Sequence, residues 1–367
     1  MILGLMTNYA QNTVSGSISH STGNRTYQLY VPASYDGTTA VPLVLNLHGY
    51  TSNNTQQMFY GDFKPIADTA NFLILAPQGT NDGTGNAHWN ANWATGVDDI
   101  GFLSALIDSL SADYNINADR VYSTGMSNGG FMSFTLAGQL SDKIAAVASV
   151  TGTMSILQIP ANTLNRPMPI MQIHGTADAT VDYNGDANFL SVDSVISYWV
   201  AHNNCNTTPV VTAVPDVNTT DGCTAERIDY LNGDNGAEVV HYKVTNGAHT
   251  WPGAGITIGV TNQDFDASTE IWKFFMRYEK SNFVSVNEIN STDETIKLIS
   301  ENPTNGSLQF VSESNELLEF NVFDLNGKSI MNTRSNGAID ISGFENGIYL
   351  INISSSNGAA TFKVVKK

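Results

Sequence analysis

The 367-residue sequence has few basic residues and no long hydrophobic run, and each shortage excludes a class of protein. Its 16 lysine and arginine residues face 34 aspartate and glutamate residues, which gives a formal net charge of −18. Because no basic run is present, the chain has no electrostatic basis for binding a phosphate backbone, and we expect no nucleic acid partner. No segment approaches the roughly 18 apolar residues of a membrane span, so none is expected.

Cysteine is also scarce, with only Cys205 and Cys223. No histidine and cysteine cluster has the spacing of metal ligands, so we expect no metal site. Both cysteines lie in a stretch rich in threonine, asparagine and proline. Such a pair suits a disulfide formed in an oxidising compartment, although two unrelated buried thiols would give the same count.

The first twelve residues, MILGLMTNYAQN, contain a short apolar stretch without a basic region before it. They are either the tail of an export signal or a frayed arm. The rest of the chain is 41% hydrophobic and 10% aromatic, which is ample for a packed core.

Apolar strand patterns alternate with helical patterns over residues 14–281. Continuous apolar strands joined by helices predict a mainly parallel sheet covered on both faces, which is an α/β fold. Strands are expected at 26–32, 42–50, 72–79, 120–125, 144–152, 168–175 and 237–249. Helices are expected at 56–71, 98–114, 129–140, 191–202 and 266–279.

The pattern changes after this region. Residues 282–296 are polar and are interpreted as a linker. Residues 297–367 contain short alternating runs with Asn-Gly turn signals, which predict a small all-β sandwich domain. The sequence therefore predicts two domains.

One serine, Ser127, lies in the segment STGMSNGGFM between a predicted strand and a predicted helix. A nucleophile exposed on a sharp strand-to-helix turn needs small neighbours, which Gly125 and Gly129 supply, and Gly130 would allow close helix packing. The free N–H groups at the helix start would stabilise a developing oxyanion. The segment predicts a catalytic serine.

An acid and a histidine follow in the order that a serine hydrolase of this fold requires. Asp178 comes directly after an apolar strand, with Asp182 and Asp186 as rivals on the same loop. His249 follows the last predicted strand and is the expected base. His48 and His174 precede glycines at strand ends and are expected to brace loops, whereas no role is assigned to His20, His88, His202 and His241.

Further residues complete the predicted site. The backbone N–H groups of Tyr50 and Asn128 are the expected oxyanion donors. Aromatic residues on loops suggest an aromatic-lined cleft, or else ordinary packing, and the candidates are Tyr50, Trp89, Trp93 and Trp251. Asp98 and Asp99 open a helix, and we expect them to cap it.

The motifs LHGYTSN, HWNANW with VDDIGF, VYSTGMSNGGFM, IHGTADATVDY and GAHTWPG resemble, in this order, the polyhydroxybutyrate depolymerase and feruloyl or acetylxylan esterase family. The resemblance spans residues 25–279 and implies an α/β-hydrolase fold with the triad Ser127, Asp178 and His249. It also implies a pairing of Cys205 with Cys223. The loop at Tyr50 lacks the cysteine or glycine run common in the family and is similar to that of cutinase-like polyester hydrolases, and Asp182 stands where proline is usual.

The C-terminal segments ENPTNGSLQF, VFDLNGK, NGIYLINI and TFKVVKK resemble a type IX secretion sorting domain. This resemblance implies a secreted or cell-surface protein that meets the secretion machinery. Together the two resemblances predict a secreted, monomeric serine esterase that needs no cofactor and acts on feruloyl or acetyl esters of plant cell-wall polysaccharide. The alternatives are a polyester depolymerase, a serine peptidase and a non-catalytic carbohydrate-binding protein.

Overall fold

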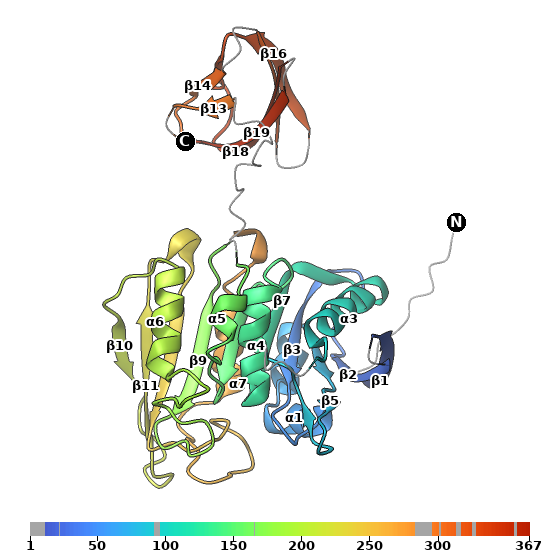
Figure 1. The fold of residues 1–367 in the computed structure, drawn as a ribbon, viewed down its shortest axis with the longest axis vertical. Helices are drawn as coiled ribbons and strands as arrows, with labels where there is room; N and C mark the ends of the chain where they lie inside the picture. Colours follow the sequence, from blue (N-terminus) through green and yellow to red (C-terminus); the bar gives the residue numbers. More distant parts are fainter. Residues whose placement is uncertain are drawn as a thin grey trace. The chain divides into compact units, whose positions relative to one another are not determined.

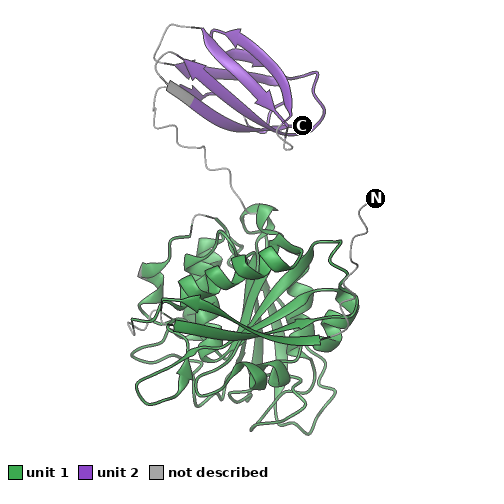
Figure 2. Ribbon diagram, turned by 90° about the vertical axis from the view of Figure 1, so that its right-hand side faces the viewer, with its two compact units in different colours: residues 1–283 green, residues 284–367 purple. Residues whose placement is uncertain are grey.

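The computed structural model describes two compact units, residues 1–283 and 284–367, which Figure 2 colours separately. The described residues are 12–21, 23–91, 96–164, 166–282, 296–300, 302–312, 317–324, 328–355 and 358–367. The N-terminal segment 1–11 and nearly all of the predicted linker 282–296 lie outside them. No helix among the described residues is long and apolar enough to cross a membrane.

The larger unit is built around a ten-stranded sheet (Figure 1) in the order β1-β2-β4-β3-β7-β8-β9-β12-β11-β10. Its six central strands run parallel to one another, and the strands at both edges pair in antiparallel fashion. The predicted strands correspond to β2 Gly23–Val31, β3 Val41–Leu47, β4 Leu73–Pro77, β7 Ile116–Met126, β8 Ala146–Val150, β9 Ile170–Gly175 and β12 Val239–Thr245.

Helices cover both faces of the sheet because successive strand residues point to opposite sides. In β3, Leu43, Leu45 and Leu47 enter one core cluster, whereas Val44 enters the other. One face is covered by α3 Asp99–Asp113, α4 Asn128–Gln139 and α6 Val192–His202. The other is covered by α1 Asn54–Tyr60, α2 Lys64–Ala70 and α7 Ala267–Phe275. The prediction of a mainly parallel α/β fold is confirmed.

The helix predicted at 56–71 is two helices, so that part of the prediction was wrong. The first, α1, ends at Gly61, whose N–H donates to the Gln57 carbonyl at 2.9 Å. The second, α2, restarts with Pro65 in its first turn. This position suits proline because the N–H that proline lacks would have no helical partner there.

Several further elements were not predicted at all: β1 Asn12–His20, β5 Thr80–Asn81, β6 Ala87–His88, α5 Gln158–Ala161, β10 Val210–Ala213, β11 Thr224–Tyr230, η1 Asp234–Gly236 and η2 Lys280–Asn282.

The smaller unit consists of two antiparallel sheets, as its turn-rich sequence predicts. A three-stranded sheet contains β13 Ile296–Leu298, β14 Ser307–Ser312 and β17 Ala338–Asp340. A four-stranded sheet contains β15 Leu318–Phe323, β16 Ser329–Ser335, β18 Gly347–Ser355 and β19 Gly358–Lys366. Phe310 of the first sheet contacts Phe320 and Phe362 of the second, with ring centroids 5.5 and 5.1 Å apart, so one apolar core joins the two sheets.

Candidate active site

Ser127 lies on a sharp turn between β7 and α4. Its backbone has φ = 56° and ψ = −121°, a sparsely populated conformation that costs on the order of 1–3 kcal/mol. The surrounding backbone leaves no room for side chains, since a Cβ on Gly125 would lie 2.6 Å from the Leu47 oxygen, and one on Gly129 would meet the same atom. The strand, the strained serine and the helix together form the turn that the glycine spacing predicts.

Asp178 and His249 are brought together by two neighbouring parallel strands. The loop that follows β9 carries Asp178, and the loop that follows β12 carries His249. The two loops are joined by a hydrogen bond from the Ala177 N–H to the Gly247 carbonyl (2.9 Å). Nδ1 of His249 then lies 2.7 Å from Oδ2 of Asp178. The side chain of His249 is one-fifth exposed and that of Asp178 is buried.

The carboxylate of Asp178 is surrounded by donors. Its Oδ1 accepts from the N–H groups of Thr180 (2.8 Å) and Val181 (2.9 Å), and its Oδ2 also lies 3.3 Å from Nε2 of His174. Burial acts to raise the pKa of Asp178, but the hydrogen bonds from His174, His249 and the backbone outweigh it and hold the pKa well below its usual range. Asp178 is therefore ionised across the neutral range.

The structure separates Asp178 from its two rivals. Asp182 and Asp186 are exposed, and their carboxylates accept from backbone N–H groups of their own turns. His174 is the residue whose part in the site the sequence analysis missed. Its expected bracing role is seen in contacts with Gln172 and with the Val181 carbonyl, but its approach to Asp178 was not foreseen. The only signal was its position four residues before Asp178.

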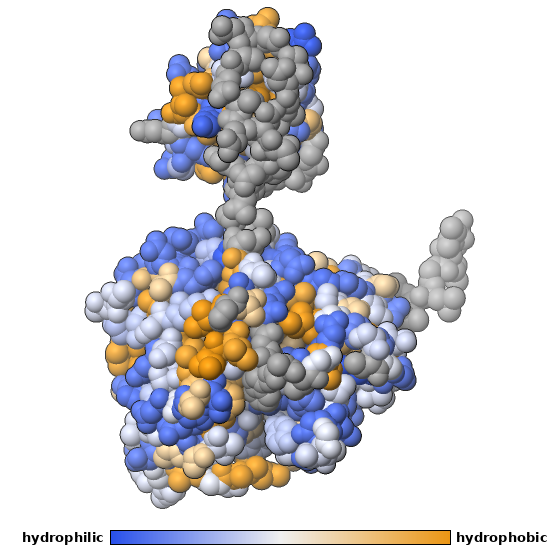
Figure 3. Space-filling model, viewed as in Figure 1, coloured by the Kyte–Doolittle hydropathy of each residue, from blue (hydrophilic) through white to orange (hydrophobic). Residues whose placement is uncertain are grey.

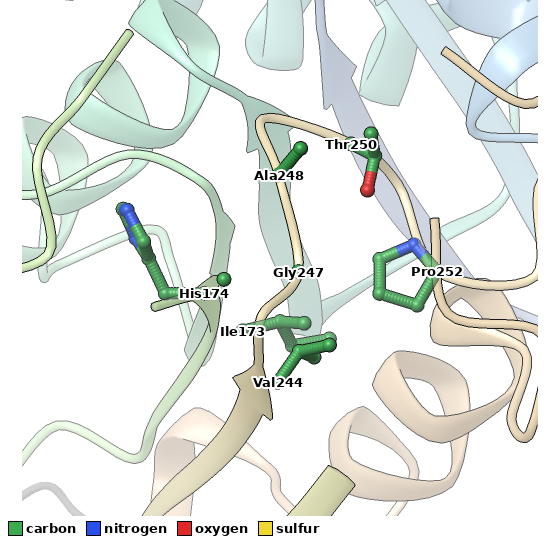
Figure 4. Close-up of a pocket in the computed structure, with 8 residues that line it drawn as sticks. Ile173, His174, Val244, Gly247, Ala248, Thr250 and Pro252 are labelled. Atoms are coloured by element: carbon green, nitrogen blue, oxygen red, sulfur yellow. The ribbon is translucent and has the colours of Figure 1, made fainter. Parts of the chain in front are cut away.

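Figure 4 shows the small pocket behind the His249 loop. Gly247 and Ala248 lie across its centre, with His174 on one side and Thr250 and Pro252 on the other. Beyond it Trp251 is buried, and its indole Nε1–H donates to Ser268 Oγ at 3.2 Å. Trp251 therefore anchors the loop instead of facing solvent.

The loop His48-Gly49-Tyr50 passes directly beside the serine. A Cβ built on Gly49 would lie 3.4 Å from the Cβ of Ser127. The backbone N–H groups of Tyr50 and Asn128 have no hydrogen-bond partner within the described part of the chain. Tyr50 is 45% exposed.

His48 and Trp89 support this loop from inside. Burial lowers the pKa of His48 to about 4, so its ring is neutral; Nδ1 donates to the Gly49 carbonyl (2.8 Å) and Nε2 accepts from the Gly79 N–H (2.9 Å). The bracing role predicted for His48 is confirmed. Trp89 is fully buried, and its indole donates to the His48 carbonyl at 2.9 Å.

The expected aromatic cleft is therefore not present as predicted. Trp89 and Trp251 are buried packing residues, because each has an apolar ring that fills the core and an N–H with an internal partner. Trp93 lies outside the described residues. Of the four candidates only Tyr50 is observed to be exposed.

The helix-opening aspartates take different roles. Asp98 caps α3 by accepting from the Gly101 N–H at 2.8 Å, as expected. Asp99 is buried and instead pairs with Arg25 at 2.7 Å while accepting from the Asn90 N–H.

No group of three or more histidine, cysteine, aspartate or glutamate side chains that could hold a metal is found among the described residues.

The predicted disulfide is contradicted by the structure, in which Cys205 and Cys223 are both free and buried. Asn206 bonds to the Leu231 carbonyl at the end of β11, whereas Cys223 directly precedes the first residue of that strand. Seven strand residues at about 3.3 Å each place the two cysteines roughly 20 Å apart, but a disulfide needs Cα atoms within about 7 Å. Burial raises the pKa of each thiol to about 11, so both are unreactive.

In Figure 3 hydrophobic residues are visible at the lower end of the larger unit, where Figure 1 places the loops that follow the parallel strands. Some exposed apolar residues of these loops are near the site: the backbone of Val260 accepts from Ala248, next to His249. The strongly exposed residues on these loops are Ile156, Leu157, Ile256 and Ile258.

The fold and these residues define a protein of the α/β-hydrolase class. Residues 36–198 match the phospholipase/carboxylesterase family, and residues 302–367 match the secretion system C-terminal sorting domain family. Part of the larger unit is thus similar to an esterase family, and the smaller unit is similar to a domain that sorts proteins for secretion.

Individual relatives agree with this assignment. The chain is 34% identical over 149 residues to a bifunctional acetylxylan esterase/xylanase of Neocallimastix patriciarum (41% of this chain, 21% of the relative), and 28% identical over 176 residues to feruloyl esterase B of Piromyces equi (47% and 33%). It thus spans a third or less of the length of each. The solved acetyl xylan esterase of Aspergillus awamori superposes with a TM-score of 0.51 at 12% identity (72% of this chain, 99% of that one), which supports the fold.

Proposed function

We propose that the protein is a secreted serine carboxylic-ester hydrolase whose triad is Ser127, Asp178 and His249. The observation that carries the proposal is the 2.7 Å contact between His249 and Asp178 at the same sheet edge as the strained Ser127 turn. Because Asp178 is ionised, its Oδ2 accepts the Nδ1 proton of His249. The Nε2 atom is then the one with a free lone pair, which suits it to act as a base.

In the proposed reaction, His249 Nε2 takes the hydroxyl proton of Ser127 as its Oγ attacks the ester carbonyl carbon. The oxyanion accepts hydrogen bonds from the N–H groups of Tyr50 and Asn128. The C–O bond to the alcohol breaks, and the alcohol leaves with the proton from His249. Water attacks the acyl-enzyme in the same way and releases the acid. Within the described residues Ser127 Oγ makes no hydrogen bond, so its contact with His249 belongs to the proposal.

The proposed substrates are feruloyl or acetyl esters of plant cell-wall polysaccharide, because the relatives above are named for such esters. The proposed partner of the smaller unit is the secretion machinery, and the larger unit acts as a monomer. A polyester is the second candidate substrate, favoured by the exposed Ile256 and Ile258, which follow His249 on the same loop.

Substitution of the nucleophile tests the reaction. Ser127→Ala should lower kcat on p-nitrophenyl acetate by at least about 10³-fold without unfolding the protein, because nucleophile and base act as one unit. A variant that keeps more than about a tenth of the activity would refute the assignment, since a tenfold loss is only about 1.4 kcal/mol. Parallel assays with peptide anilides test for a peptidase, and assays with methyl ferulate, acetylated xylan and polyhydroxybutyrate film decide between the substrate classes.

A further inference from the structure

The exposed ring of Tyr50 is held at its hydroxyl by the β5–β6 hairpin. The hydroxyl donates to Oδ2 of Asp82 (2.7 Å) and accepts from the side-chain amide of Asn86 (3.2 Å). The other oxygen of Asp82 closes the hairpin loop by accepting from the N–H groups of Thr84 (2.8 Å) and Asn86 (3.0 Å). One carboxylate thus shapes the loop with one oxygen and holds Tyr50 with the other.

The same hairpin is tied to the turn that carries the nucleophile. The chain leaves β6 directly into Trp89, whose backbone N–H and carbonyl are both bonded to the side chain of Asn128, at 2.6 and 3.0 Å. In addition, the Thr51 N–H donates to the Ala87 carbonyl at 2.9 Å. Residues 80–89 therefore contact both expected oxyanion donors: the loop that carries Tyr50, and Asn128 itself.

We propose that Asp82 is a positioning residue that fixes the Tyr50 N–H relative to the Asn128 N–H and so preorganises the oxyanion hole. This inference rests on the proposed function. Two donors stabilise a developing oxyanion only if their spacing is set before the reaction, and displacement by a fraction of an ångström weakens both bonds.

The physical basis is that a half-exposed ring needs bonds to stay in one place. With 45% of Tyr50 exposed, packing leaves its rotation partly free, and fixing it costs side-chain entropy. The ionised Asp82 supplies a charge-assisted hydrogen bond, which is stronger than a neutral one. The hydrogen bonds from Tyr50 and Thr84 hold the pKa of Asp82 well below its usual range, so this support persists through the neutral range.

The test is a double-mutant cycle on the full chain. Tyr50→Phe removes only the hydroxyl and keeps the ring and the backbone N–H, and Asp82→Ala removes its acceptor. We expect each variant to lower kcat about five- to tenfold on p-nitrophenyl acetate with KM within twofold, because the loss is in the transition state. The double variant should be no worse than Asp82→Ala alone, because Asp82→Ala already removes the contact with the Tyr50 hydroxyl as well as the bonds that shape the hairpin loop.

A matched control is Asp36→Ala. Asp36 is an exposed carboxylate that accepts from the N–H and hydroxyl of Thr38, as Asp82 does from Thr84, but it has no contact with Tyr50 or Asn128. Its replacement should leave kcat and KM unchanged. The proposal would be overturned if the double variant lost 25-fold or more in kcat, which is the product of two independent fivefold effects. It would also be overturned if the single variants changed KM alone.

A second measurement does not require turnover. Amide hydrogen exchange of residues 49–52 should become faster in both Tyr50→Phe and Asp82→Ala than in the wild type, and remain unchanged in Asp36→Ala. Unchanged exchange in the first two variants refutes the positioning role even if the chain hydrolyses no ester. A different outcome separates the two proposals. If the wild type hydrolyses no ester but exchange is still faster in the two variants, the positioning role of Asp82 is supported and only the proposed function is refuted.

Discussion

The two units of the chain differ in what they bury. The larger unit buries many polar side chains beside its apolar clusters, among them Asn46, His48, Asp99, Gln172, His174 and Asp178. Among the described residues of the smaller unit, only Thr304 and Lys366 are buried polar residues, and its core is otherwise apolar. Because burial of a polar group costs free energy unless it is hydrogen-bonded, such groups accumulate where geometry must be fixed.

Some of the buried polar groups of the larger unit lie at the end of the sheet that carries Ser127. His48, His174 and Asp178 lie at or after the carboxyl ends of parallel strands, where ligands bind in open α/β sheets. In the described strands β15 and β18 of the smaller unit, buried residues alternate with residues that are partly or fully exposed. The difference is consistent with the proposal that places the reaction in the larger unit.

The largest expected effect is on activity in the larger unit. Asp178→Asn should lower kcat by about 10⁴-fold, because the amide no longer holds His249 in the required tautomer. Asp182→Asn is the matched control, since Asp182 is an exposed turn residue four positions away. Steady-state kinetics on p-nitrophenyl acetate would measure both variants. The reverse result would identify Asp182 as the acid.

The second prediction concerns stability in the smaller unit. Phe320 is fully buried and contacts Phe310 of the facing sheet, so Phe320→Ala should cost about 3–5 kcal/mol. In thermal unfolding, the transition of the smaller unit should move down or disappear while kcat at 25 °C stays the same. A parallel loss of kcat would mean that the apolar unit contributes to catalysis, contrary to the comparison.

The contrast also explains what the sequence could predict. Ser127, Asp178 and His249 each follow an apolar strand. Because the strands are parallel, their carboxyl ends lie on the same side of the sheet, and the sequence alone predicts that the three residues lie there. Trp89 and Trp251 were misjudged as cleft residues because a tryptophan on a loop can turn inward when its indole N–H finds a partner, which depends on contacts distant in sequence.

The other errors have the same origin. The two cysteines are only 18 residues apart in the sequence, but they lie near opposite ends of the unpredicted strand β11, because Cys223 precedes its first residue and Asn206 bonds to Leu231 after its last. The contact of His174 with Asp178 depends on the loop that returns the carboxylate toward the strand, which residue spacing alone does not reveal. Local patterns predicted the elements, whereas side-chain direction within loops required the tertiary structure.

A smaller effect should follow from removal of the second histidine at Asp178. In His174→Phe the carboxylate loses one donor, so its pKa should rise toward the ordinary value and the ionised form should be lost at a higher pH. The loss of kcat/KM should therefore be greatest at the lowest pH at which the protein stays folded, below about pH 5, and small at pH 8. His174→Gln, which keeps a donor, should restore part of the loss. An equal loss at every pH would indicate a purely structural role.

The smallest expected effect is that of removing the second unit. The last helix of the larger unit, α7, buries its apolar face in the core by itself, and Lys280 of η2 donates to the Asp142 carbonyl, which lies just before β8. The core of the larger unit is thus closed by its own residues, including those at the end of the strands opposite to Ser127, before the second unit begins. A chain that ends at Asn282 should keep its kcat and KM on p-nitrophenyl acetate within twofold. In a host with the matching secretion system, the same chain should remain inside the cell, as fractionation would measure. A truncated chain that unfolds at the wild-type temperature but loses most of its kcat would show that the second unit shapes the site.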